Sequence, residues 1–179
     1  MTLRIQSPSA LLLVQPLQAQ WLDAAGHALA QPPAPEVPVR IVADLIEETH
    51  VRIEVPGLMG ADRSSFIQVQ LQALLPDVPL RATWQSAGQQ PLLPKPFALY
   101  AVGVASQALN TLLQEQGQQQ RPLEGVWPLS YLMARWAGRQ KQLPANDWLF
   151  LCLGLPYGLR MVLLHKGVPV FSRLLLDTS

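Results

Sequence analysis

Three consecutive β-strands at the C-terminus constrain the fold of this chain more than any other feature. Apolar runs occupy Trp148–Leu155, Leu159–His165 and Val168–Leu176, and the turn sequences Pro156-Tyr157-Gly158 and Lys166-Gly167 separate them. Short apolar segments bounded by glycine- and proline-containing turns are typical of β-strands. Strands joined by such short turns pair antiparallel, so we predict a three-stranded antiparallel unit at the end of the chain.

Further strands are expected in the first half of the chain. Leu11–Gln15 and Gln18–Leu22 are two short strands joined at Pro16. Val39–Ile46 and His50–Val55 are expected to pair as a hairpin around Glu47-Glu48-Thr49, because apolar and polar residues alternate in the second segment with the period of a half-buried strand. Later strands are predicted at Leu80–Trp84, Phe97–Val104 and Pro122–Val126, and the second of these is apolar enough to be covered on both faces.

Three helices are expected between these strands. Asp62 and Ser106 are the predicted N-caps of the first two helices, and Pro128 suits the first turn of the third. Apolar residues recur at helical spacing in each, at Ile67, Leu71, Leu74 and Leu75, at Leu109, Leu112 and Leu113, and at Leu129, Leu132, Met133 and Trp136. The order of elements predicts an α/β fold with a mixed sheet and flanking helices. We expect a first subdomain at residues 1–138, and a linker with the start of a second subdomain at residues 139–179.

The composition of the chain indicates which kinds of partner it can bind. Charged residues make up 14% of the chain, against a usual value of about 25%, and the formal net charge is +1. No basic block is present, which argues against a nucleic-acid partner. A surface with few charges favours protein contacts, although a solvated surface rich in glutamine explains it equally well. No run approaches 18 apolar residues, so we expect no membrane span within these residues and a cytosolic location.

Familiar catalytic and metal-binding patterns are absent from the sequence. The single cysteine, Cys152, allows no intrachain disulfide, and its apolar neighbours predict a buried, inert thiol. Asp44, Glu47 and Glu48 are the sole candidate magnesium cluster, and a solvated turn is the preferred interpretation. The chain contains no glycine-rich phosphate-loop motif, no Gly-x-Ser-x-Gly sequence and no zinc spacing. We therefore predict no catalytic residue, no cofactor and no metal.

Several segments together resemble a known family. Asp44–Pro56, followed by Gly60-Ala-Asp-Arg63, resembles the early strands and first helix of the actin-like cytoplasmic proteins of type IV pilus and type II secretion assembly platforms, the PilM and GspL kind. Pro122–Ser130 resembles their short strand leading into a helix, and Leu149–Gly154 with His165–Arg173 resembles the start of their second half. The resemblance extends over most of the chain from Val39 onward.

This resemblance implies an actin-like (ribonuclease-H-like) fold in which the second half is truncated to the three-stranded unit. In such folds a loop in each half holds magnesium and phosphate. By the resemblance, the aspartate of the second loop falls on Cys152, its glycine on Gly154 and its hydroxyl near Tyr157, while the first loop falls on Val14–Gln18. A neutral thiol does not hold a magnesium–phosphate complex as a carboxylate does, so we expect ATP binding to be lost.

The resemblance also implies a function. We expect a non-catalytic scaffold at the inner face of the bacterial inner membrane, docked to inner-membrane assembly proteins, with the assembly ATPase as a further partner and a homodimer also compatible. Trp84, Trp127 and Tyr157 are candidate anchors for protein partners, although each taken singly suits the core as well. Two alternatives stay open at this point, namely a nucleotide-binding actin-like ATPase or switch protein, and a ribonuclease-H-like nuclease.

Overall fold

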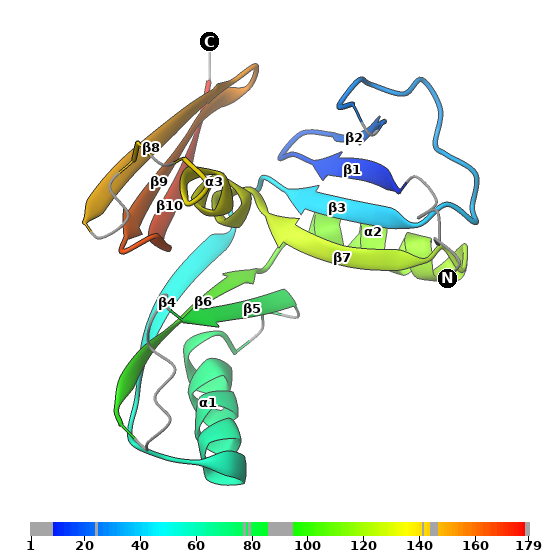
Figure 1. Cartoon of the computed structure of the whole chain (residues 1–179). Helices are drawn as coiled ribbons and strands as arrows, with labels where there is room; N and C mark the ends of the chain where they lie inside the picture. The colour runs from blue at the N-terminus through cyan, green and yellow to red at the C-terminus, as the bar shows by residue number, and fades with distance from the viewer. Residues whose placement is uncertain are drawn as a thin grey trace, which may run out of the picture. The chain divides into compact units, whose positions relative to one another are not determined.

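The computed structural model describes residues 9–23, 25–76, 78, 80–85, 95–140, 142–143 and 147–177, without the side chains of residues 80, 82, 84 and 85. The chain divides into two compact units, one made of Met1–Leu45 and Ser106–Leu129 and the other of Ile46–Ala105 and Ser130–Ser179. Each unit therefore combines two separate parts of the sequence, which Figure 1 distinguishes by colour. The expected boundary between residues 138 and 139 does not coincide with this division, and as a boundary between two actin-like halves it stays a prediction.

The first unit is built on a mixed four-stranded sheet. Its order is β2-β1-β3-β7, and it comprises β1 (Ala10–Val14), β2 (Ala19–Leu22), β3 (Val39–Ala43) and β7 (Leu123–Pro128). β1 and β2 form the predicted antiparallel hairpin, whereas β1 with β3 and β3 with β7 run parallel. The helix α2 (Gln107–Gln118) lies along this sheet in Figure 1, and the Ser106 side chain accepts a hydrogen bond from the Leu109 backbone N–H, which confirms the predicted cap.

The second unit contains two antiparallel sheets. In the first, β6 (Phe97–Val104) lies between β4 (Glu48–Val55) and β5 (Leu80–Gln85). The helix α1 (Gly60–Leu74) packs on it through Leu71, which joins a core cluster with Ile53, Val55 and Phe97. All eight residues of β6 are buried, because Ala98 and Tyr100 on its other face contact Val168. The prediction that this strand is covered on both faces is confirmed.

The C-terminal sheet has the order β10-β9-β8 and is antiparallel throughout. Its strands are β8 (Trp148–Leu155), β9 (Gly158–His165) and β10 (Val168–Leu176), so the predicted three-stranded unit is confirmed almost residue by residue. These strands form a sheet of their own. The helix α3 (Leu129–Ala137) covers one face of this sheet, where Ala134 and Ala137 pack against Val162 and Leu164.

The orientation of α3 differs from the predicted one. Its fully buried positions are Ser130, Ala134 and Ala137, whereas Trp136 is 57% exposed. Small side chains let the helix lie close to the sheet, and this close approach decides which side faces inward. Helical spacing of large apolar residues therefore identified the helix and placed Met133 against this core, but it wrongly placed Trp136 on the inward side.

Two further local predictions are wrong. β3 and β4 do not form a hairpin, because β3 pairs with β1 and β7 in one unit while β4 pairs with β6 in the other. Their proximity in the sequence suggested a direct pairing that long-range partners override. Asp62 lies in the first turn of α1 but does not cap it; Met59 occupies the N-cap position, without a side-chain hydrogen bond.

Candidate functional site

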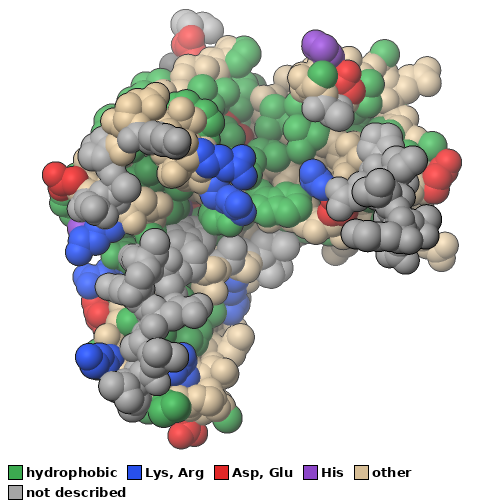
Figure 2. All heavy atoms as spheres, viewed as in Figure 1, with side chains coloured by type: hydrophobic (Ala, Val, Ile, Leu, Met, Phe, Trp, Pro, Cys, Tyr) green, Lys and Arg blue, Asp and Glu red, His purple; other side chains and the backbone are tan. Residues whose placement is uncertain are grey.

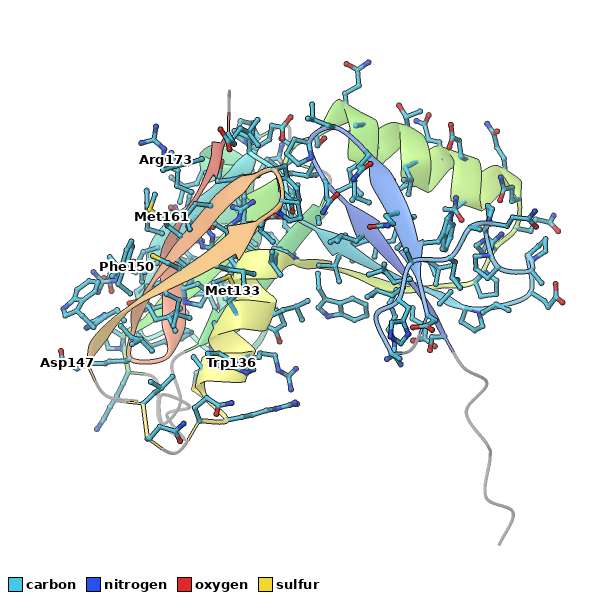
Figure 3. The ribbon with its side chains drawn as sticks, turned by 90° about the horizontal axis from the view of Figure 1, so that it is seen from above. Met133, Trp136, Asp147, Phe150, Met161 and Arg173 are labelled. Atoms are coloured by element: carbon cyan, nitrogen blue, oxygen red, sulfur yellow. The ribbon has the colours of Figure 1, made fainter. Side chains whose placement is uncertain are left out.

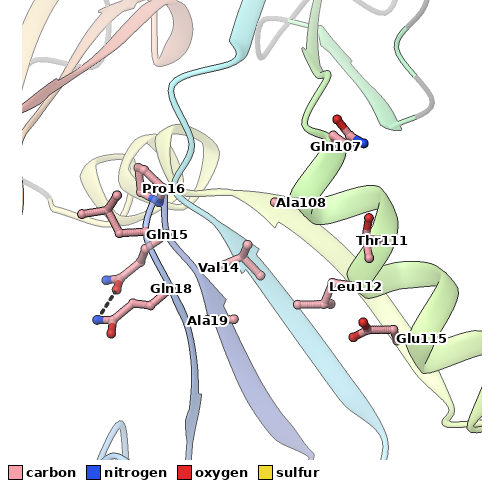
Figure 4. Close-up of a pocket in the computed structure, with 11 residues that line it drawn as sticks. Val14, Gln15, Pro16, Gln18, Ala19, Gln107, Ala108, Thr111, Leu112 and Glu115 are labelled. Atoms are coloured by element: carbon pink, nitrogen blue, oxygen red, sulfur yellow. Dashed lines mark hydrogen bonds between the residues drawn. The ribbon is translucent and has the colours of Figure 1, made fainter.

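The turn between β1 and β2 is where the first phosphate loop of an actin-like fold is expected. A pocket of about 570 Å³ lies between this turn and α2, lined on one side by Val14–Ala19 and on the other by Gln107, Ala108, Thr111, Leu112 and Glu115. Figure 4 shows Leu112 of α2 pointing toward Val14, whereas the Gln15 and Gln18 side chains are directed away from α2. The pocket lies within the first unit, so its geometry is defined by that unit alone.

The chemistry of this pocket does not suit a triphosphate. Among the described residues, Glu115 is the sole charged one that lines it, and its charge would repel phosphate. Within the turn, the Gln15 N–H donates to the Gln18 carbonyl at 2.8 Å, and Pro16 has no N–H to offer. The Gln18 amide donates to the Gln15 side-chain oxygen at 3.1 Å, so the two polar side chains of the turn satisfy each other. The pocket is thus a neutral recess with one acidic side chain at its wall.

The expected second phosphate loop lies at the start of the C-terminal sheet. Cys152 and Gly154 belong to the regular part of β8, and only Tyr157 lies in the β8–β9 turn. The Tyr157 carbonyl accepts a hydrogen bond from the Asp177 N–H at 2.9 Å, which ties the turn to the end of β10. Cys152 is exposed, contrary to the prediction of a buried thiol. The reason is that Cys152 points away from α3, whereas its apolar neighbour Leu151 packs on the core beneath that helix.

A buried polar cluster surrounds Glu48 in the second unit. The Ser130 hydroxyl donates to Glu48 Oε1, and His50 Nε2 lies 2.6 Å from the same oxygen. The Arg160 guanidinium lies 3.7 Å from Glu48 Oε2 and donates to the Ser172 hydroxyl at 2.9 Å. Since the Glu48 and Arg160 side chains are each 1% exposed, the cluster is sealed from solvent and joins α3 to β4, β9 and β10.

This cluster contains a serine, a histidine and a carboxylate, yet their order is wrong for nucleophilic catalysis. The carboxylate stands between the other two, whereas a nucleophilic serine requires the histidine as its direct partner. The predicted solvated turn is correct for Glu47, which is exposed in a turn, but wrong for Asp44 and Glu48, which as whole residues are 0% and 9% exposed. Among the described residues, no three His, Cys, Asp or Glu side chains group in a way that could hold a metal ion.

The three predicted protein anchors have different surroundings. Trp84 lies in β5, but its side chain is outside the described part of the structure. Trp127 is half-buried in β7, where its ring lies over Gly125, so close that a methyl group at Gly125 would lie 2.7 Å from the ring. Tyr157 is half-buried in the β8–β9 turn. Trp127 belongs to the first unit, and Trp84 and Tyr157 belong to the second.

An apolar surface that the sequence interpretation missed lies on the C-terminal sheet. Cross-strand register places Phe150, Leu163 and Phe171 in one row, and Cys152, Met161 and Arg173 in the next. Phe150 and Phe171 are 55% and 46% exposed. Figure 3 shows Phe150, Met161 and Arg173 on the side of the sheet opposite to Met133 of α3. We call this side the outer face. Arg173 was the available signal, because it lies two residues after Phe171 and therefore on the same face of the strand.

Charged groups are sparse on the surface as well. Figure 2 shows the basic and acidic side chains as small scattered groups among hydrophobic and neutral ones on the face in view. In the part of the chain that the structure describes, no helix is both long and apolar enough to cross a membrane.

Comparison with known proteins relates this architecture to bacterial assembly machines. No protein-family model and no curated protein matches the chain. Among solved structures, a chain of the PilM–PilN type IV pilus biogenesis complex matches with a TM-score of 0.57 and 11% identity over 97% of this chain. The cytoplasmic domain of EpsL, an inner-membrane component of the type II secretion system of Vibrio cholerae, matches with a TM-score of 0.51 and 14% identity over 94% of this chain and 70% of the domain.

At 11% and 14% sequence identity, the similarity to these two structures establishes the fold alone. The chain spans 62% of the length of the matched chain in the PilM–PilN complex. The predicted resemblance to the PilM and GspL kind is confirmed at this level, from the mixed sheet of the first unit to the antiparallel C-terminal unit. The chain has the actin-like, ribonuclease-H-like fold of these pilus and secretion proteins.

Proposed function

We propose that this protein is a non-catalytic scaffold of a type IV pilus or type II secretion assembly platform, acting at the cytoplasmic face of the inner membrane through protein–protein contacts. One observation carries the proposal. The actin-like framework is present, but the turn at its first phosphate-loop position has no carboxylate, and its Gln15 N–H is already bonded to the Gln18 carbonyl. An actin-like fold without the side chains that hold magnesium and phosphate can still offer its surface to protein partners.

The rest of the structure supports the same function. The buried serine, histidine and carboxylate of the Glu48 cluster are arranged to hold strands together. Large apolar side chains are exposed on the C-terminal sheet instead, with Phe150 and Phe171 each about half exposed. Exposed aromatic residues of this kind are enriched where proteins bind each other.

The partners follow from the same reasoning. One solved relative is a complex of PilM with PilN, and the other is a component of an inner-membrane secretion system. We infer an inner-membrane assembly protein as the direct partner of this chain, and the assembly ATPase as a second one. Trp127 and Tyr157 remain candidate anchors for them.

Affinity purification tests this function. The tagged chain is expressed in its own host, membranes are solubilised in mild detergent, and co-purifying proteins are identified by mass spectrometry. We expect an inner-membrane assembly protein to be enriched over a tag-only control. A Trp127→Ala variant should reduce the enrichment if this anchor is used, while Trp136→Ala, which changes an exposed tryptophan of the other unit, is the matched control. Recovery of soluble enzymes alone, with no assembly protein, would contradict the proposal.

A further inference from the structure

The side of α3 that faces away from the C-terminal sheet carries two arginines and a tryptophan. Ala134 and Ala137 pack against the sheet. Successive residues of a helix are about 100° apart, so Arg135 and Trp136 fall on the opposite side, with Arg139 between them. The Arg139 N–H donates to the Trp136 carbonyl at 3.0 Å, which continues the helical turn. All three residues are exposed, and we call them the α3 patch.

The positive charge of this patch is not neutralised within the described structure. No described carboxylate forms an ion pair with Arg135 or Arg139. Arg135 donates to the Tyr131 hydroxyl at 3.3 Å, and its guanidinium lies 5.8 Å from the centre of that ring. An arginine stacked on an aromatic ring keeps its charge and its other N–H donors. In the sequence, residues 125–146 also include Lys141 and no acidic residue.

The unit that contains α3 is basic as a whole. It comprises Ile46–Ala105 and Ser130–Ser179, and it has ten Lys and Arg residues against seven Asp and Glu. The other unit has three basic residues against five acidic ones. The formal net charge of +1 for the chain is therefore the result of two units of opposite sign. A positive patch on a positive unit attracts an anionic surface.

Arginine beside tryptophan suits a phospholipid surface. A guanidinium binds two phosphate oxygens at once, and a tryptophan ring prefers the level of the lipid headgroups. Basic residues are attracted to the cytoplasmic leaflet because its lipids are anionic. The patch lies on a convex helix surface, so a protein partner would need a matching hollow, whereas mobile headgroups adapt to it. Lipid is therefore the favoured occupant.

We propose that the α3 patch contacts anionic phospholipids directly, with Arg135 and Arg139 at phosphate groups and Trp136 among the headgroups. The inference rests on the proposed function only for the location, the inner face of the membrane. Two arginines and one aromatic ring give weak, reversible binding, because stable anchoring takes stronger signals. The contact therefore adds to a protein partner that already holds the chain near the membrane.

Co-sedimentation with lipid vesicles tests the proposal. One set is pure phosphatidylcholine, and the other contains about 30% phosphatidylglycerol as the anionic lipid. The unmodified chain should bind the anionic vesicles alone, and binding should fall as salt screens the charges. The double variant Arg135→Gln with Arg139→Gln should lower the partition coefficient by about fivefold for each charge removed. Circular dichroism shows that the variant folds.

A second double variant is the matched control. Arg52→Gln with Arg173→Gln removes two exposed charges from the same unit but outside α3, and it should retain most of the binding. Equal losses for the two double variants would show that net charge alone governs binding, and would overturn the proposal. A larger loss for the control would place the contact elsewhere and overturn it as well.

Tryptophan fluorescence reports whether the patch itself enters the headgroup region. Anionic vesicles should shift the emission of the unmodified chain to shorter wavelength, and Trp136→Phe should abolish this shift. A shift that persists in Trp136→Phe would overturn the proposal. An acidic protein as the true occupant would leave the chain unbound to either kind of vesicle, which also overturns it. If an inner-membrane assembly protein still co-purifies in detergent, that failure concerns the lipid contact and leaves the scaffold function standing.

Discussion

The carboxylate of Glu48 and the guanidinium of Arg160 lie 3.7 Å apart, and each side chain is 1% exposed. Glu48 begins β4 and Arg160 belongs to the C-terminal sheet, so the pair joins two sheets of one unit. Buried ions are costly to take out of water, and removal of one partner leaves the other uncompensated. This pair is therefore a position where a single substitution has a large effect.

Arg160→Met should lower the free energy of unfolding by about 3–5 kcal/mol, because it leaves the Glu48 carboxylate buried without the Arg160 guanidinium. Chemical denaturation followed by tryptophan fluorescence measures this loss. The double variant Arg160→Met with Glu48→Gln removes both charges and should recover part of it. An Arg160→Met protein as stable as the original would show that the ion pair contributes nothing.

Gly158 should tolerate no side chain. A Cβ atom at this position would lie 2.0 Å from the Leu175 carbonyl oxygen, and its φ of +154° is one that other residues rarely adopt. Gly158→Ala should therefore cost about 2 kcal/mol or more. Gly154, in the neighbouring strand, has open space where a Cβ would lie, and Gly154→Ala should change stability by less than about 1 kcal/mol. Equal melting temperatures for the two variants would contradict the close approach of β9 and β10.

The orientation of α3 predicts opposite tolerance at two neighbouring positions. Ala134 is 5% exposed against Val162 and Leu164, so Ala134→Leu should overfill this core and cost about 1–3 kcal/mol. Trp136 is 57% exposed, and Trp136→Ala should lie within about 0.5 kcal/mol of the original. Figure 3 shows Trp136 on α3. If the alanine substitution at Trp136 proves the more damaging one, the helix presents the face that the sequence pattern suggested.

A surface ion pair in the first unit should be visible in a pH titration. Arg40 Nε donates a hydrogen bond to Glu124, and this bond lowers the pKa of the Glu124 carboxyl below its usual value. A carboxyl pKa that is lower in the folded state adds stability above the unfolded pKa, and this contribution is lost as the pH falls through the folded pKa. Arg40→Met should raise the Glu124 pKa, as measured by NMR titration of its side-chain carboxyl. An unchanged pKa would mean that the pair does not form in solution.

Local patterns were sufficient for some elements of the fold. The C-terminal strands are joined by very short turns, so sequence neighbours are also spatial neighbours, and the predicted segments agree with β8, β9 and β10. The Ser106 cap is likewise a contact over three residues. In both cases the information that decides the structure lies within a few residues.

Other features depend on partners that are distant in sequence. β3 is adjacent to β4 along the chain, yet it pairs with β1 and β7, and no local pattern distinguishes these pairings from a hairpin. The burial of Glu48 depends on Ser130 and Arg160, which lie more than 80 residues further along the chain. In β8 every residue is apolar apart from Gly154, so alternation could not show that Phe150 and Cys152 face solvent.

The absence of a nucleotide site is the central claim, and isothermal titration calorimetry with Mg–ATP tests it most directly. Because the β1–β2 turn offers no carboxylate and its Gln15 N–H is already bonded to the Gln18 carbonyl, we predict no measurable heat of binding up to millimolar ATP. Saturable binding with a micromolar dissociation constant would contradict the account and favour a nucleotide-dependent switch.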